Sequence, residues 1–170
     1  NFYNGDPIKA VQLIEDFGSK FQSGEIQFWQ GYIYTNLGRY LKAIEALNIS
    51  EKLGNKSVDL YTFKGYNYLY LTNYRKAKKA FENSICIEKN ADAYNGLALA
   101  LIRLGKDVDV ALAIIDKALS IRFDSDFLYT KSAVVTELAS QSVNHKDSLF
   151  NVALQLLDSA MDIEYLPYMY

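Results

Sequence analysis

Two stretches of the chain carry one pattern of residues at a fixed spacing of 34 positions. The first stretch holds Gly31, Tyr34, Leu37, Tyr40, Ala43, Leu47 and Ser50, and the second holds Gly65, Tyr68, Leu71, Tyr74, Ala77, Phe81 and Ser84. A repeat of this length is typical of stacked repeat proteins, in which each unit buries its apolar face against the next unit. The pattern therefore predicts an array of similar units, and it constrains the fold more than any other feature of the chain.

The residue types in the pattern predict helices. Apolar residues recur at helical spacing, and the chain of 170 residues has only two prolines, each of which would cost about 3 kcal/mol in a helix interior. We expect a single helix from Pro7, followed by four helix pairs. The expected pairs are 25–37 with 40–53, 58–71 with 74–87, 91–104 with 108–121, and 126–139 with about 148–163.

The spacing of the pairs predicts one continuous domain over residues 1–170. The third pair follows the second at 33 residues (Gly65 to Ala98), and the fourth follows the third at 35 residues (Ala98 to Ala133). The last helix arrives about seven residues late, which predicts an insertion between the two helices of the fourth pair. The expected parts are a half repeat at 1–23, which would be the second helix of a preceding repeat, repeats at 24–57, 58–90, 91–125 and 126–167, and an inserted loop at 140–147.

Small residues recur where the two helices of a pair must approach closely, with larger apolar residues between them. The small residues are Gly31, Gly65, Ala98 and Ala133 in the first helices and Ala43, Ala77, Ala111 and Ala153 in the second, and Leu47, Phe81, Ile115 and Leu157 fill the space. We also expect inward-facing apolar residues in the helix from Pro7 and near the end of the helix from Tyr40. These are Ala10, Leu13, Ile14, Phe17 and Leu53.

At these residues the chain resembles the tetratricopeptide repeat family. The segment Gly38-Arg39-Tyr40-Leu41-Lys42-Ala43-Ile44 is the closest match to the family pattern, and the resemblance covers about residues 24–167 and, as half a repeat, residues 1–23. It departs where the family has a Trp in the first helix, because Gln27, Tyr61, Tyr94 and Tyr129 stand there. The resemblance implies an all-α fold, a right-handed α-solenoid of antiparallel helix pairs, whose concave wall binds peptides or helices of partner proteins.

The second face of the first helices is the predicted partner-binding surface. Tyr and Trp often anchor interfaces, because they bury a large area at a low cost in rotamer entropy. The alternative is that these aromatic side chains cover one another, or the N-terminal helix, as ordinary core. A clamp for a terminal carboxylate, as co-chaperone members of the family have, is not expected, because the aromatic half of the wall lacks cations. The candidate residues are Phe28, Trp29, Tyr32, Phe63, Tyr66 and Tyr70, with Arg103 and Lys131 further along the wall.

No motif predicts catalysis, a metal site or a cofactor. His145 has no second His and no Cys nearby, so it cannot complete a zinc site, and Cys86 is expected to be a buried structural thiol. The net charge of −2 does not favour a nucleic-acid partner, and we interpret the basic strip Arg75, Lys76, Lys78 and Lys79 as a solvated face.

No apolar stretch has the roughly 20 residues that span a membrane. A single cysteine fits a reducing compartment, so we expect a cytoplasmic location, while a removed signal sequence stays open.

Two other functions stay open. Both ends of the repeat array look unfinished, with the half repeat in front and Tyr165, Tyr168 and Tyr170 at the back. Such ends can stack into a homo-oligomer with a structural or assembly role. The segment can also be a regulatory region of a larger protein.

Overall fold

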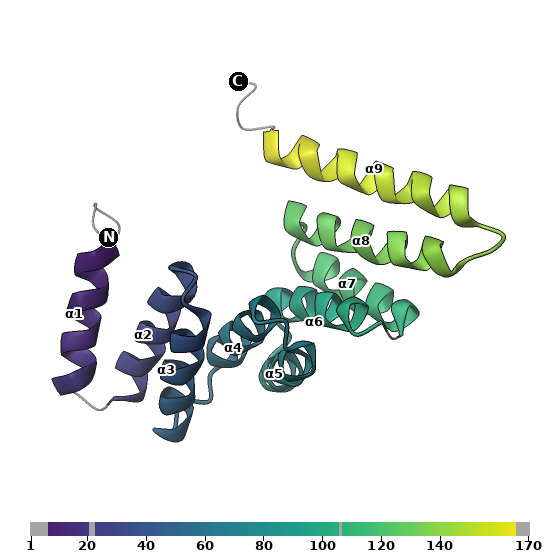
Figure 1. Cartoon of the computed structure of the whole chain (residues 1–170). Helices are drawn as coiled ribbons and strands as arrows, with labels where there is room; N and C mark the ends of the chain where they lie inside the picture. Colours follow the sequence, from purple (N-terminus) through teal and green to yellow (C-terminus); the bar gives the residue numbers. More distant parts are fainter. Residues whose placement is uncertain (1–6, 21–22, 106, 166–170) are drawn as a thin grey trace. The chain divides into compact units, whose positions relative to one another are not determined.

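The computed structural model describes residues 7–20, 23–105 and 107–165, and these are almost entirely helical (Figure 1). No strand occurs in these ranges. Two compact units divide the chain, Asn1–Glu88 and Lys89–Tyr170, and each is described by itself. The first unit contains α1 (Pro7–Lys20), α2 (Gly24–Asn36), α3 (Tyr40–Lys52), α4 (Val58–Tyr70) and α5 (Tyr74–Ile87), and the second contains α6 (Ala91–Arg103), α7 (Val108–Ile121), α8 (Ser125–Gln141) and α9 (Lys146–Tyr165).

The predicted all-α fold and its helix pairs are confirmed. Every expected helix is present in the described ranges, and its observed ends lie within two residues of the expected ones. Polar residues precede several helices and accept a hydrogen bond from the first turn, as Asn90 Oδ1 does from the Ala93 amide at 2.9 Å. Gly38 ends α2 with a φ of +68°, a left-handed conformation that costs little without a side chain. The expectation of one continuous domain and the repeat boundaries stay predictions.

Close approach of the paired helices explains the repeated glycines. A Cβ atom added at Gly31 would lie 2.5 Å from Leu47 Cγ, and one added at Gly65 would collide with the ring of Phe81. Leu47 and Phe81 are fully buried. The glycine in the first helix therefore provides the space that the large apolar side chain of the second helix fills.

A hydroxyl group explains why serine recurs at the end of the 34-residue pattern. Ser50 Oγ on α3 donates to the carbonyl oxygen of Gly24 at 2.6 Å, and Ser84 Oγ on α5 donates to that of Val58 at 3.1 Å. In both repeats the serine of the second helix thus binds the first residue of its partner helix. Because both hydroxyls are buried, these bonds also satisfy groups that would be costly to leave unpaired.

The first helix, α1, turns a different face inward from the one expected. Val11 is buried against Tyr34, Ala43 and Ala46, whereas Leu13 and Phe17 are 56% and 48% exposed. The predicted inward orientation of Leu13 and Phe17 is therefore wrong, and the side chain of Ala10 lies outside the described residues. The described residues that pack on Val11 belong to α2 and α3, so these two helices cover the side of α1 that carries it. Leu53, also expected inside, is exposed just after the end of α3.

The fourth pair follows the third at 34 residues, because the residue equivalent to Ala98 is Ser132 (132 − 98 = 34). Ser132 is buried on α8, and its Oγ donates to the carbonyl oxygen of Ala153 on α9 at 2.9 Å. Ala133 is exposed. The predicted position of Ala133 in the close helix contact is therefore wrong by one residue.

The inserted residues lengthen two helices and do not form a long loop. With the corrected register, α8 is expected to end at 137 and α9 to begin at 150 (108 + 42), but α8 continues to Gln141 and α9 begins at Lys146. Each helix gains four residues, which is about one turn. Only residues 142–145 connect the two helices, so residues 140–141 and 146–147 of the predicted loop are helical. No helix in the described ranges combines the length and apolarity needed to cross a membrane.

The corrected register predicts that Ser132 does not tolerate a larger side chain, whereas the adjacent Ala133 does. Ser132→Gln should lower the free energy of unfolding by about 2 to 3 kcal/mol, because it overfills a packed contact and removes a buried hydrogen bond. Ala133→Gln should change it by no more than about 0.5 kcal/mol, because the side chain points to solvent. Urea unfolding followed by circular dichroism measures both. A larger loss for Ala133→Gln than for Ser132→Gln would contradict the register.

Candidate partner-binding surface

Four aromatic side chains of α2 and α4 form a closed cluster in the first unit. The ring centroids of Phe28 and Trp29 are 5.5 Å apart, those of Trp29 and Tyr32 5.6 Å, those of Tyr32 and Phe63 5.1 Å, and those of Phe63 and Phe28 6.0 Å. All four contacts are edge-to-face, with interplanar angles of 67° to 89°. Each ring therefore contacts two others in a geometry that aromatic rings favour. We call Phe28, Trp29, Tyr32 and Phe63 the aromatic cluster.

The aromatic cluster has a buried base and an exposed rim. Phe28 and Phe63 are partly buried and pack against the core residues Leu47, Leu60 and Tyr61. Trp29 is 48% exposed. The two Phe side chains therefore pack on the core while the indole reaches the surface, and partner binding by these residues stays a prediction.

A polar link between α2 and α4 lies beside the aromatic cluster. Asn67 is fully buried, and its Nδ2 donates to Thr35 Oγ1 at 2.7 Å and to the carbonyl oxygen of Phe63 at 2.8 Å. Thr35 Oγ1 donates in turn to the carbonyl oxygen of Gly31 at 2.8 Å. These bonds hold together the two helices that carry the cluster. The sequence carries no signal for this link, because neither Asn67 nor Thr35 recurs with the repeat.

The other two aromatic candidates have their own ring partners. Tyr66 packs edge to face against Phe81, with a centroid distance of 5.1 Å. Tyr70 is 58% exposed and stacks on Tyr40 at 4.5 Å with an interplanar angle of 13°. The structure therefore brings four of the six aromatic candidates into one cluster. Tyr40 was not among the candidates, and its stacking has no signal in the sequence because it depends on how α3 lies beside α4.

The two cationic candidates belong to the second unit. Arg103 is exposed in the last turn of α6. Lys131 on α8 forms an ion pair with Asp116 on α7 at 2.7 Å. In the corrected register Lys131 is equivalent to the buried Leu97, so it does not occupy the face on which Arg103 lies.

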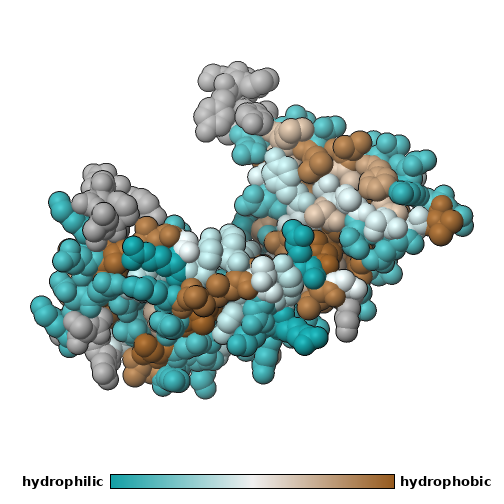
Figure 2. Space-filling model, in the orientation of Figure 1, coloured by the Kyte–Doolittle hydropathy of each residue, from teal (hydrophilic) through white to brown (hydrophobic). Residues whose placement is uncertain are grey.

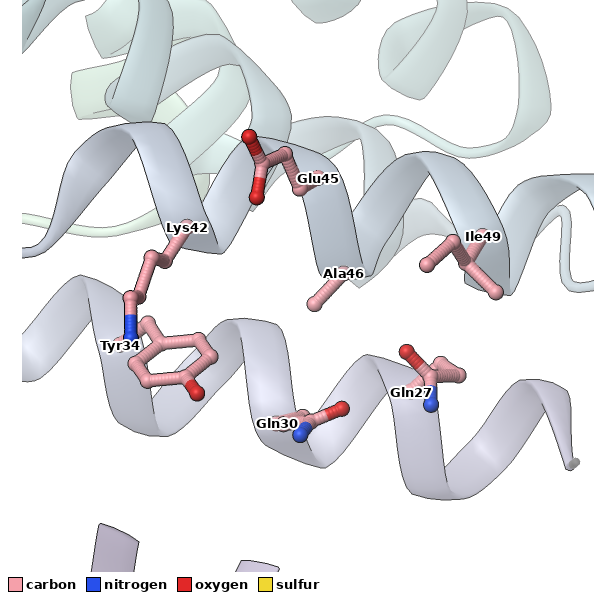
Figure 3. Close-up of a pocket in the computed structure, with 7 residues that line it drawn as sticks. All are labelled: Gln27, Gln30, Tyr34, Lys42, Glu45, Ala46 and Ile49. Atoms are coloured by element: carbon pink, nitrogen blue, oxygen red, sulfur yellow. The ribbon is translucent and has the colours of Figure 1, made fainter. Parts of the chain in front are cut away.

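A pocket of about 250 Å³ lies between α2 and α3 in the first unit (Figure 3). Seven residues line it, namely Gln27, Gln30, Tyr34, Lys42, Glu45, Ala46 and Ile49. Tyr34 Oη donates to Glu15 Oε1 on α1 at 2.5 Å, and Lys42 Nζ lies 3.5 Å from the same oxygen. Burial, reinforced by this hydrogen bond, raises the pKa of Tyr34 to about 12. An activated phenol would need the opposite shift, so these groups attach α1 to α2 and α3 and do not suggest catalysis.

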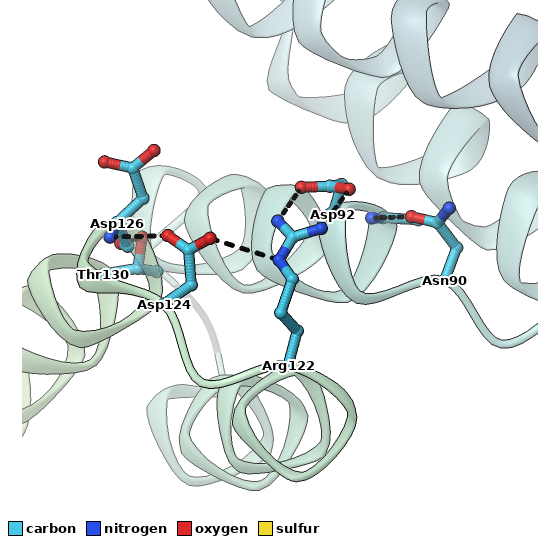
Figure 4. Close-up of polar contacts among 7 residues, drawn as sticks. Asn90, Asp92, Arg122, Asp124, Asp126 and Thr130 are labelled. Carbon is cyan, nitrogen blue, oxygen red and sulfur yellow. Dashed lines mark hydrogen bonds and ion pairs between the residues drawn. The ribbon is translucent and has the colours of Figure 1, made fainter.

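An arginine network joins α6, α7 and α8 in the second unit (Figure 4). Arg122 makes a two-pronged contact with Asp92, with distances of 3.1 and 2.6 Å, and its Nε donates to Asp124 at 3.1 Å. The guanidinium group also lies 4.7 Å from the centroid of the Phe127 ring. The hydrogen bond to Asp92 raises the pKa of Arg122. Since Asp124 caps α8, this network fixes the turn between α7 and α8.

The remaining sequence candidates do not form a chemical site. Cys86 is exposed, so the predicted buried thiol is wrong, because this turn of α5 presents the residue to solvent. His145 is exposed in the 142–145 connection. In the described part of the chain, no three His, Cys, Asp or Glu residues lie close enough together to hold a metal ion.

Comparison with known proteins gives a family match for two segments of the chain. The family model described as tetratricopeptide repeat matches residues 24–48 and 58–90. A search of curated proteins finds no match. These two matched segments contain α2, most of α3, α4 and α5, which are the helices that carry and support the aromatic cluster.

Solved structures of similar fold cover most of the chain. A crystal structure of MamA matches with a TM-score of 0.75 and 21% identity, over 98% of this chain and 93% of that one. MamA from Desulfovibrio magneticus RS-1 (residues 41 to the end) matches with a TM-score of 0.74 and 18% identity, over 94% of this chain and 86% of that one. YrrB, described as a TPR protein with an unusual peptide-binding site, matches with a TM-score of 0.62 and 17% identity, over 88% and 90%. At these identities the likeness shows the fold alone.

Proposed function

Since the chain carries tetratricopeptide repeats, we propose that it is a protein-interaction scaffold whose first unit binds a peptide or helix of a partner protein at the aromatic cluster. The proposed function is binding, and it requires no catalytic step by this chain. The absence of a nucleic-acid partner, a cytoplasmic location and the lack of an enzymatic role stay predictions from the sequence.

The exposed indole on a fixed aromatic base is the observation that supports this function. Trp29 is half exposed, while Phe28 beneath it is packed on the core. Large aromatic side chains at the centre of an interface supply much of its binding energy. An anchor whose neighbours are already ordered loses little further entropy when a partner binds. The peptide-binding site named for YrrB is consistent with this use of the fold.

Trp29→Ala should abolish or strongly weaken peptide binding while the protein stays folded. A randomised 12-residue displayed peptide library, selected on the immobilised full chain, supplies the probes. Binding of an enriched peptide can be followed by the emission of Trp29, because the chain has no other Trp, and by calorimetry for the variants. The affinity should fall at least about tenfold in Trp29→Ala, as expected for an aromatic anchor that contributes about 2 kcal/mol.

Phe123→Ala is the matched control, because Phe123 is an exposed aromatic residue of the second unit. It should leave the affinity unchanged. Phe63→Ala is a poor test, since loss of its core contacts would also destabilise the unit. Failure to enrich any peptide, or equal binding by Trp29→Ala, would contradict the proposed function.

Self-association is a second candidate function, favoured by exposed apolar residues on α1 and α9. Leu13 and Phe17 are exposed on α1, and Leu154 and Met161 are exposed on α9. Figure 2 shows hydrophobic residues among hydrophilic ones over α9.

Self-association predicts a mass that rises with protein concentration in sedimentation equilibrium, and Leu13→Glu should reduce the rise. A monomeric mass at every concentration would contradict it.

A further inference from the structure

We propose that the segment bound by the aromatic cluster carries a Lys or Arg next to its apolar anchor, about one helical turn away if the segment is helical. This inference rests on the proposed function and adds the chemistry of the partner. It follows from the charges around the cluster.

Two carboxylates flank the aromatic cluster on the same face. Glu25 lies four residues before Trp29 on α2, and Asp59 lies four residues before Phe63 on α4. Side chains four residues apart on a helix are neighbours on one face, with their Cβ atoms about 5 to 6 Å apart. Glu25 and Asp59 are also equivalent positions of the repeat, since 59 − 25 = 34. Each helix therefore places one acidic group one turn before its aromatic group.

Neither carboxylate is neutralised within the described part of the chain. Both side chains are exposed, and neither forms an ion pair with a described residue. On α3 and α4, Lys64 pairs with Glu51 and Lys42 with Glu15, and Lys52 in the last turn of α3 forms no ion pair with either carboxylate. The two carboxylates are therefore free to interact with a partner.

The helices that carry the cluster supply almost no positive charge. α2 contains no Lys or Arg, and the only one in α4 is Lys64, which is buried. On these two helices the exposed groups at the cluster are therefore aromatic and acidic. The faces of Trp and Tyr rings attract cations as well, so the rings and the carboxylates favour the same kind of partner. An acidic segment or a free carboxylate terminus would be repelled.

Stabilisation of the helix N-terminus accounts for part of this pattern, because Asp92 and Asp126 occupy equivalent positions in the second unit. That role leaves the carboxylate free to act on a partner unless a cation of the same chain binds it. Asp92 is bound by Arg122, whereas Glu25 and Asp59 are not paired with a described residue. Asp126 also lacks an ion pair with a described residue, but the residue four positions after it is Thr130 and not an aromatic one. An unpaired carboxylate one turn before an aromatic ring therefore favours recognition at the first unit.

The peptides selected on the full chain test this chemistry. We expect them to be enriched in Lys or Arg three or four residues from an aromatic or aliphatic residue, or two residues away if they bind extended. The variant with both Glu25→Gln and Asp59→Asn should bind such a peptide roughly fivefold more weakly, which is the range for two exposed charge contacts. Added salt should weaken binding to the wild-type chain more than to this variant.

Asp109→Asn is the matched control, because Asp109 is an exposed acidic residue in the first turn of α7 and its loss removes the same kind of helix-end stabilisation. It should leave the affinity unchanged, and thermal melting should show all variants folded. Replacing the Lys or Arg of the peptide by Gln should lower its affinity for the wild-type chain but not for the double variant.

The outcomes separate this inference from the proposed function. Peptides that lose binding in Trp29→Ala but bind the double variant as well as the wild type would overturn the inference and keep the function. Peptides that bind Trp29→Ala normally would overturn both. Enrichment of acidic peptides would also overturn the inference. So would a competition experiment in which a second copy of this chain displaces every selected peptide.

Discussion

The structure depends on how closely the two helices of each pair approach. Gly31 leaves the space that Leu47 fills, and no side chain larger than a hydrogen atom fits there without movement. Gly65 does the same for the ring of Phe81. Alanines of the second helices are fully buried at the same contacts. Since interiors are close-packed, this contact sets both the spacing of a pair and the rotation of each helix about its axis.

The rotation of α2 determines which side chains are left for a partner. With Gly31 turned toward α3, Gln27 and Tyr34 are also buried, and Trp29 points to the surface. The aromatic cluster then serves two purposes, because its Phe side chains complete the core and its indole faces solvent. The same rotation places Glu25 beside Trp29. The proposed recognition of a cationic, apolar segment thus follows from the packing that stabilises the repeat.

Much of the fold could be predicted from the sequence, because a repeat imposes one solution on several segments. The glycines, alanines and large apolar residues of the pattern have the buried positions expected in the first two pairs. The fourth pair was misaligned, since Ser132 and Ala133 are both small and only the contact with Ala153 distinguishes them. The inserted residues were predicted as loop because their polarity hid a helical extension on each side.

The candidate site was predictable only in part. The face carrying Trp29 followed from helical periodicity, but the edge-to-face contacts and the stacking of Tyr70 on Tyr40 depend on the spacing between helices. The predicted inward face of α1 was also wrong, since Val11 packs on Tyr34, Ala43 and Ala46 of the neighbouring helices. Periodicity assigns residues to a face, and only the neighbouring helices decide which face is covered.

The most direct test of the close helix approach is the effect of Gly31→Ala with and without Leu47→Ala, measured by urea unfolding. In the wild-type chain Gly31→Ala should lower the free energy of unfolding by about 1 to 3 kcal/mol, because the new methyl group collides with Leu47. In the Leu47→Ala background the same change should be neutral or stabilising, since alanine is favoured over glycine in a helix by about 1 kcal/mol. Equal stabilisation by Gly31→Ala in both backgrounds would contradict the account.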